Sequence, residues 1–186
     1  MTKLFVRAVL TSATAALLLA GCTAKEPGNA SPASTSSAPS TGETSSASGG
    51  ATTASLDPCS LLSATDLASY GTFGDPRKRE GSGARSCGYL RKAQDASDSH
   101  LGVDVNIRDS QGIDSVNDGG KGTIPSQVNA RQAVLVPTGE TNCVVAMAVG
   151  STSRVDITVT SAADSTKACD TASQVAKIVE PKLPKG

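Results

Sequence analysis

Residues 23–55 of this 186-residue chain contain no large apolar side chain, which limits the part of the chain that can form a folded core. Every residue of the segment is Ser, Thr, Ala, Gly or Pro, except for Lys25, Glu26, Asn29 and Glu43. Without large apolar side chains, the segment cannot recover the entropy that it would lose on ordering, so we expect a disordered tether. A flexible chain of this length spans about 30–35 Å. We therefore expect one folded domain in residues 56–186, where about 130 residues can enclose a single core.

The first 21 residues have the features of a secretory signal peptide. Lys3 and Arg7 give the segment a positive start, and residues 8–20 form an uncharged, mostly apolar stretch. This stretch is shorter than the roughly 20 residues of a membrane-spanning helix. It ends in Leu-Ala-Gly-Cys at residues 19–22. The sequence therefore predicts export, with removal of residues 1–21.

The four residues that end at Cys22 resemble the lipobox of bacterial lipoproteins. The resemblance implies that the Cys22 thiol carries a diacylglycerol group, with palmitate among its acyl chains. Several acyl chains hold a protein firmly on a bilayer, at roughly 0.8 kcal/mol per buried methylene. We expect a lipid anchor at the outer face of the cytoplasmic membrane and a tether over residues 22–55. The alternative is a plain secretory signal that a cysteine happens to follow.

The charge balance excludes two classes of partner. Removal of Lys3 and Arg7 leaves fifteen basic residues against seventeen acidic ones, because residues 1–21 contain no Asp or Glu. A net charge near −2 gives no basis for nucleic-acid binding. It also excludes a strongly basic surface that would bind anionic lipids by charge alone.

Four cysteines follow Cys22, and an even number in an exported protein predicts two disulfides. They are Cys59, Cys87, Cys143 and Cys169. Three pairings are open, and we favour Cys59–Cys87 with Cys143–Cys169, because each closes a short loop. Each bridge would stabilise the domain by roughly 2–4 kcal/mol. A zinc site is the alternative, but the cysteines lack Cys-x-x-Cys spacing and His100 is the only histidine.

Both ends of the domain have helix signals. Asp57 and Pro58 suit an N-cap and a first helical position, and Ser63 begins a second start that Gly71 would end, so we expect two short helices. Near the C-terminus, apolar residues recur at three- and four-residue spacing, and prolines then end the helix. These residues are Ala168, Ala172, Val175, Ala176, Val179, Pro181 and Pro184.

Between the helices, alternating apolar residues predict strands. We expect them at 87–91, 101–107, 128–136, 143–149 and 154–160, with a hairpin at 150–153 and irregular chain at 72–86, 92–100 and 109–127. The fold class is therefore α+β: a single antiparallel sheet, with the short N-terminal helices and the C-terminal helix packed on one face.

Several short motifs together resemble a family of actinobacterial lipoproteins that is known as a domain of unknown function. They are Asp57-Pro58-Cys59-Ser60-Leu61-Leu62, Cys87-Gly88-Tyr89, Cys143-Val144-Val145, and a helix from Cys169 that ends in Leu183-Pro184. The resemblance covers residues 56–186 and implies an envelope location, two disulfides and an α+β fold. Tyr89 stands where this family commonly has an aromatic residue, often Trp. The resemblance transfers no catalytic residues.

Candidate chemical sites are weak. The sole histidine, His100, lies in a polar segment without a Gly-x-Ser-x-Gly motif, so we expect a solvated loop residue. Asp114 and Asp118 only partly match a calcium loop, because Val116 and Pro125 replace ligands. Gly119–Thr123 departs from a phosphate loop, since Gly122 follows Lys121. We therefore predict no metal and no cofactor. One basic cluster stands out within 77–85, beside acids that would balance it: Arg77, Lys78, Arg79 and Arg85.

We expect a non-catalytic binding or interaction module that contacts an envelope protein, a wall component or a small apolar ligand. A dry pocket between sheet and helix would favour the ligand, and a solid core would favour surface contact with a protein. The alternative is an envelope-acting enzyme or enzyme accessory, which would have to use carboxylates such as Asp104 or Asp156. A ligand sensor for another membrane protein is equally open.

Overall fold

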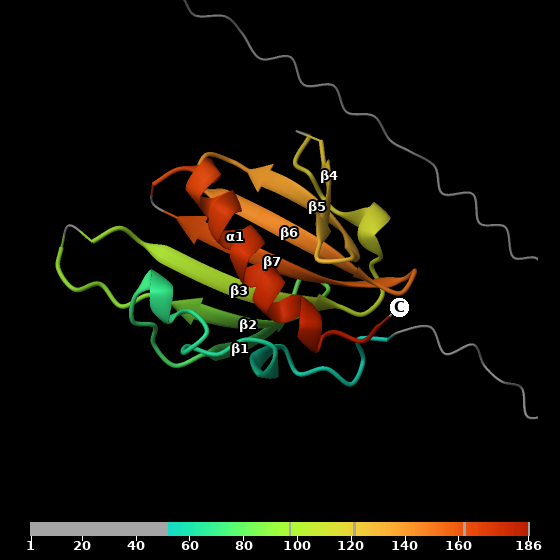
Figure 1. Cartoon of the computed structure of the whole chain (residues 1–186), viewed down its shortest axis with the longest axis horizontal. Helices are drawn as coiled ribbons and strands as arrows, with labels where there is room; N and C mark the ends of the chain where they lie inside the picture. Colours follow the sequence, from blue (N-terminus) through green and yellow to red (C-terminus); the bar gives the residue numbers. More distant parts are fainter. Residues whose placement is uncertain (1–51, 97, 121, 162, 186) are drawn as a thin grey trace, which may run out of the picture. The chain divides into compact units, whose positions relative to one another are not determined.

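Figure 1 shows a computed structural model of the chain, which describes residues 52–96, 98–120, 122–161 and 163–185. The predicted signal peptide, Cys22 and nearly all of the predicted tether lie outside the described residues. The end of the predicted tether belongs to the domain, because Thr53 is 1 % exposed and its hydroxyl donates to Asp109 at 2.7 Å. The described residues all belong to the unit that begins at Ser45.

Seven strands form a single antiparallel sheet in the order β1-β2-β3-β7-β6-β5-β4. They are β1 (Arg77–Gly81), β2 (Ala84–Leu90), β3 (Leu101–Arg108), β4 (Ile124–Val128), β5 (Arg131–Thr138), β6 (Asn142–Val149) and β7 (Ser153–Ser161). The chain makes two meanders, β1 to β3 and β4 to β7, and residues 109–123 connect them. β3, the last strand of the first meander, pairs along its full length with β7, the last strand of the second. These two strands therefore join the two halves of the sheet.

One face of the sheet carries the core. Along β3 the side chains alternate between buried and half-buried, and the antiparallel register places buried residues of β2, β6 and β7 on the same face. The 15-residue helix α1 (Ser165–Val179) lies across this face and packs on β5, β6 and β7 (Figure 1). Its apolar stripe is fully buried, as the spacing predicts: Ala168, Ala172, Val175, Ala176 and Val179.

Two disulfides tie the covering segments to the sheet. Cys143 in β6 is bonded to Cys169 in α1, and Cys59 to Cys87 in β2, which is the pairing that the short loops favour. The N-terminal segment contains two three-residue 3₁₀ turns, η1 (Pro58–Ser60) and η2 (Ala68–Tyr70), in place of the two expected short helices. Asp57 does cap the backbone N–H of Cys59, but the single turn is followed by packing of Leu61 and Leu62 into the core.

Two stretches expected to be irregular contain strands. The stretch 72–86 holds β1, because its charged side chains suit an exposed edge strand but give no apolar alternation. A two-residue turn at Ser82-Gly83, both with positive φ, connects β1 to β2. The stretch 109–127 contains a 3₁₀ turn, η3 (Ile113–Ser115), and most of β4, and Asn129 with positive φ begins the turn that separates β4 from β5. The expected single strand at 128–136 is therefore wrong at its start.

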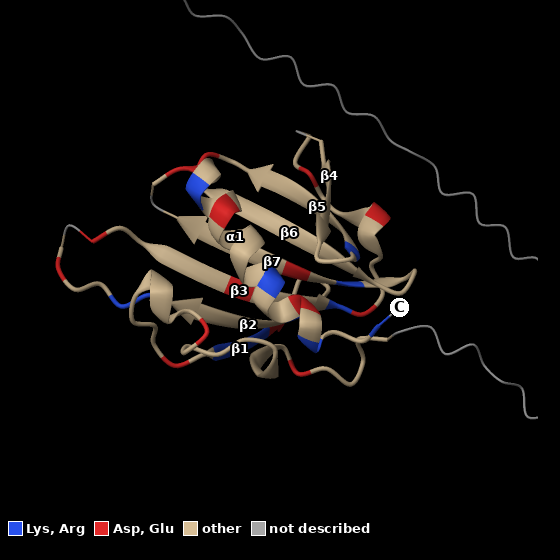
Figure 2. Cartoon of the chain, viewed as in Figure 1, with Lys and Arg blue, Asp and Glu red and all other residues tan. Residues whose placement is uncertain are grey.

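Figure 2 shows that charged residues gather on β1, the connections and α1, whereas β6 has none. The face opposite α1 carries the polar alternate residues of β2, β3 and β7. We call this surface the open face. Its two ends differ: the connection 109–123 lies against one end, where Arg154 donates to its backbone, and the other end is hollowed.

Candidate binding groove on the open face

The hollowed end of the open face is a groove of about 1000 Å³. Its floor comes from β2 and β3, one side from β1, and the other from residues 91–93 and 98–100 of the β2–β3 connection. Alternation along the strands places one set of paired residues on this face. The pairs are Arg77 with Gly88, Arg79 with Ser86, Leu90 with Gly102, and Asp104 with Gly88. Such a volume lies at the upper end of the roughly 300–1,000 Å³ of small-molecule sites.

Two glycines account for the hollow. Gly88 pairs with Arg77 on one side and Asp104 on the other, and Gly102 pairs with Leu90. A Cβ on Gly88 would lie 2.5 Å from an Asp104 oxygen and 2.9 Å from an Arg79 nitrogen. Glycine is therefore required at residue 88 for the two charged side chains to meet above the strand.

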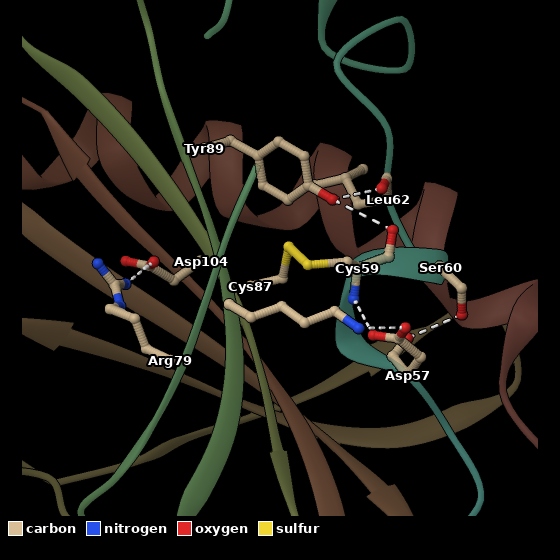
Figure 3. Close-up of a disulfide and its surroundings, with 9 residues drawn as sticks. Asp57, Cys59, Ser60, Leu62, Arg79, Cys87, Tyr89 and Asp104 are labelled. Carbon is tan, nitrogen blue, oxygen red and sulfur yellow. Dashed lines mark hydrogen bonds and ion pairs between the residues drawn. A yellow bond between two sulfur atoms is a disulfide. The ribbon is translucent and has the colours of Figure 1, made fainter. Parts of the chain in front are cut away.

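Arg79 and Asp104 form an ion pair inside the groove. Figure 3 shows this pair on one side of the strands, with the Cys59–Cys87 disulfide and Tyr89 on the other. Burial raises the pKa of the Asp104 carboxyl, although the nearby Arg79 guanidinium acts in the opposite direction. The Asp104 side chain is 28 % exposed and that of Arg79 is 59 % exposed, so the cation is the more accessible partner.

Arg91 fixes the far side of the groove. Its guanidinium donates to the Tyr70 carbonyl at 3.4 Å, to Asp98 at 3.0 Å, and to the Ser99 carbonyl. The Asp98 carboxylate also accepts from the backbone N–H of Gln94 at 3.0 Å. These contacts hold the β2–β3 connection against the N-terminal segment and so shape the wall.

Two cations at the groove differ from Arg79 and Arg91. The side chains of Arg77 and Lys92 are exposed and make no hydrogen bond or ion pair with residues 52–96, 98–120, 122–161 and 163–185, although the Lys92 backbone N–H donates to the Thr72 carbonyl. Leu90 also lies on the open face, opposite Gly102, and is 54 % exposed. His100 is exposed near Gly102, in the polar segment where we expected it.

The basic cluster predicted from the sequence is divided between the two faces. Lys78 pairs with Asp57 at 2.7 Å, and Arg85 pairs with Asp109 and donates to backbone carbonyls of residues 53 and 56. Only Arg77 and Arg79 reach the groove. The cluster is therefore no single patch, because β1 and β2 send alternate side chains to opposite faces.

The two carboxylates considered for an enzyme lie on the same face but in separate surroundings. Asp156 pairs with Arg108 at 2.7 Å and with Arg154 at 2.8 Å, and its side chain is 6 % exposed. Arg154 then donates to the Gly112 carbonyl at 2.7 Å, which holds the connection 109–123. Asp104 belongs to the groove instead. Between them, Asn106 accepts from Ser86 and donates to Thr158.

The other predicted motifs are used locally. Asp114 lies in η3, and Asp118 accepts from the backbone N–H of Gly120 within its own turn. Lys121 lies outside the described residues. In the part of the chain that the structure describes, no cluster of three or more His, Cys, Asp or Glu side chains could hold a metal ion.

The interface between α1 and the sheet is filled with buried side chains, and the groove lies on the opposite face. Among the groove residues, sequence reasoning named Arg77, Arg79, His100 and Asp104 as candidates for chemistry but missed Gly88, Gly102 and Leu90. A signal was available, because Gly102 interrupts the polar positions of an otherwise regular strand. The register that brings these positions together depends on tertiary pairing.

A family model described as "Protein of unknown function (DUF3558)" matches residues 17–182. Neither the curated proteins nor the solved structures provide a match to the chain. Among the described residues, α1 and the shorter turns are the helical segments, and none has the length and apolar character needed to cross a bilayer.

Proposed function

The chain belongs to the DUF3558 family of proteins of unknown function, and because that membership names no activity, we propose a function from the residues themselves. The protein is an exported, non-catalytic binding module, anchored to the outer face of the cytoplasmic membrane through acyl chains on Cys22. The groove on the open face is its binding site. The groove itself carries this proposal, since it combines a bare backbone floor, an exposed leucine and unpaired cations.

The anchoring part of the proposal is supported by the order of the positive start, the apolar stretch and the Leu-Ala-Gly-Cys motif. The family match begins at residue 17 and so includes this motif. Two disulfides suit an oxidising compartment outside the cytoplasm. The proposed tether, which starts at Cys22 and ends before the buried Thr53, would hold the groove away from the bilayer and leave it accessible.

A bacterial host that lipidates exported proteins allows a direct test of the anchor. We expect the complete wild-type chain in the membrane fraction, with the mass of a chain that begins at an acylated Cys22. The variant Cys22→Ser should lose the acyl mass. A wild-type chain without acyl mass at Cys22 would contradict a lipid anchor.

The groove is tested by filling it. A Cβ on Gly102 would meet His100 and Thr160 only at ordinary contact distances of 3.6 and 4.0 Å, so Gly102→Leu places a side chain in the groove without a backbone clash. Native mass spectrometry of the exported chain should show a bound envelope molecule on the wild type and none on Gly102→Leu. An equal bound mass on both proteins would place binding elsewhere.

One observation favours an envelope-acting enzyme as a second candidate. Asp104 is a carboxyl with a raised pKa inside a groove, a property common to general acids. Asp156 is poorly placed as the second acid of a two-carboxylate mechanism, because Arg108 and Arg154 occupy its oxygens. The variant Asp104→Asn distinguishes the two proposals. Under the binding proposal the variant retains its ligand, whereas under the enzyme proposal it loses turnover.

A further inference from the structure

We propose that the groove binds an anionic amphiphile, whose head group contacts Arg77, Arg79 and Lys92 and whose apolar part lies over Leu90 and the glycine floor. The inference rests on the proposed function, because it specifies the ligand class of the same groove. The head group is a phosphate or a carboxylate, the two anions that a guanidinium binds in a bidentate manner.

The charges of the groove carry the first part of the argument. Its cations are Arg77, Arg79, Arg91 and Lys92, and its acids are Asp75, Asp98 and Asp104. Two ion pairs, Arg91–Asp98 and Arg79–Asp104, neutralise two of each. The rest of the groove has two cations and one acid, so an added anion would be attracted.

The Arg79–Asp104 pair supplies the second part. A guanidinium has five N–H donors in one plane. Asp104 accepts a hydrogen bond from only one of the three nitrogens of the Arg79 guanidinium. Solvent reaches the Arg79 side chain more freely than the Asp104 side chain. A ligand anion can therefore approach the exposed part of Arg79 and compete with Asp104 for it. Because burial disfavours the charged form of Asp104, this carboxylate is a weak competitor.

Leu90 and the glycines supply the apolar part. Leu90 is one of two large apolar side chains exposed in the described residues, and Ile124 in β4 is the other. Gly88 precedes Leu90 on the same face, and Gly102 lies opposite it, so the leucine rises from bare backbone. Pro76 and Ala93 add small apolar surfaces to the lining. A ligand made only of charge would leave Leu90 exposed to water, whereas an amphiphile covers it.

The test uses the complete chain with Cys22→Ser, so that no attached lipid competes for the groove. Four probes are compared: decyl phosphate, decanoate, decyltrimethylammonium and inorganic phosphate. NMR amide shifts of Gly88 and Gly102 report binding at the floor. We expect both anionic amphiphiles to move these signals. Inorganic phosphate should bind at least about tenfold more weakly, because it covers no apolar surface. The cationic amphiphile should leave the signals in place.

Four groove variants and one control variant separate this ligand class from a general structural effect. Arg77→Gln and Lys92→Gln should each weaken decyl phosphate binding by about tenfold, the effect of losing a charge-assisted hydrogen bond. Leu90→Ser should weaken decyl phosphate but leave inorganic phosphate unchanged. Asp104→Asn should tighten binding several-fold, because the amide oxygen still accepts from Arg79 while the competing charge is gone. The control is Lys78→Gln, which removes a positive charge from β1, the strand of Arg77, but on the opposite face of the sheet. This variant should bind all four probes as the wild-type groove does.

Each result against these expectations has a definite meaning. Equal binding of decyltrimethylammonium, or weaker binding by Asp104→Asn, would overturn the anion preference while the groove remains the binding site. If none of the probes moves the Gly88 and Gly102 signals, the amphiphile inference is wrong. The proposed function still stands in that case if the natural ligand is lost from Gly102→Leu.

Discussion

Tyr89 shows how a single buried polar atom can join two segments. The residue is 2 % exposed, and its hydroxyl donates to the Leu62 carbonyl in the N-terminal segment (Figure 3). Burial, with smaller contributions from the Asp66 and Asp57 carboxylates, raises the pKa of Tyr89 to about 12. The neutral hydroxyl is therefore the form that the folded state favours.

The Tyr89 pKa predicts a loss of stability at high pH. The unfolded tyrosine releases its proton near its ordinary pKa of 10.0, whereas the folded protein retains the proton until about 12. The contribution is thus fully present below pH 10 and is lost between these values, by about 2–3 kcal/mol in total. Urea unfolding across this range measures it. Tyr89→Phe is the control, and an equally steep loss in that variant would contradict the assignment.

Asp156 predicts a large effect for a single substitution. It is the only acid with a hydrogen bond to Arg154 among the described residues, and Arg154 is 3 % exposed. Asp156→Ala leaves this guanidinium buried and unpaired, so the free energy of unfolding should fall by about 3–5 kcal/mol. Asp104→Ala, on the same face in a more exposed ion pair, should cost under about 1 kcal/mol. Similar losses for both variants in urea unfolding would contradict a special role for Asp156.

At the scale of elements, the Cys143–Cys169 disulfide decides how firmly α1 is held on the sheet. The bond closes a loop of 26 residues between β6 and the helix. Restriction of the unfolded chain by a loop of this length stabilises the protein by about 3 kcal/mol. The double variant Cys143→Ala/Cys169→Ala should lose this amount in urea unfolding. An unchanged unfolding midpoint would show that the packing of α1 alone holds the helix.

The elements differ in how far the sequence could predict them. The strand at 101–107 and the C-terminal helix were predicted well, because each buries one face and so repeats with its own period. β1 was missed, because an edge strand with both faces exposed needs no apolar residue. In the groove, Asp104 could be named from its polar position. Its partner Arg79 is 25 residues away, and only the β1-β2-β3 register brings the two together.

At the scale of the whole molecule, the order of the strands places β7, the last strand in the sequence, at the centre of the sheet. β7 lies between β3 and β6. β3, the last strand of the first meander, is therefore paired on both sides only when β7 of the second meander is in place. The central strands β3, β7 and β6 are paired on both sides and buried beneath α1 or the N-terminal segment. By contrast, β1 and β4 are each paired on one side and are mostly exposed.

This arrangement predicts a gradient of local stability across the sheet. Native-state hydrogen exchange should give opening free energies equal to the global value in β3, β7 and β6, and smaller values in β1 and β4, which can separate while the core remains packed. Because β1 provides Arg77 and Arg79, its opening would also expose one wall of the groove. A groove ligand should therefore slow exchange in β1 and leave β4 unchanged, since only the first edge contacts it. Equal slowing at both edges would instead indicate that the ligand stabilises the sheet as one unit.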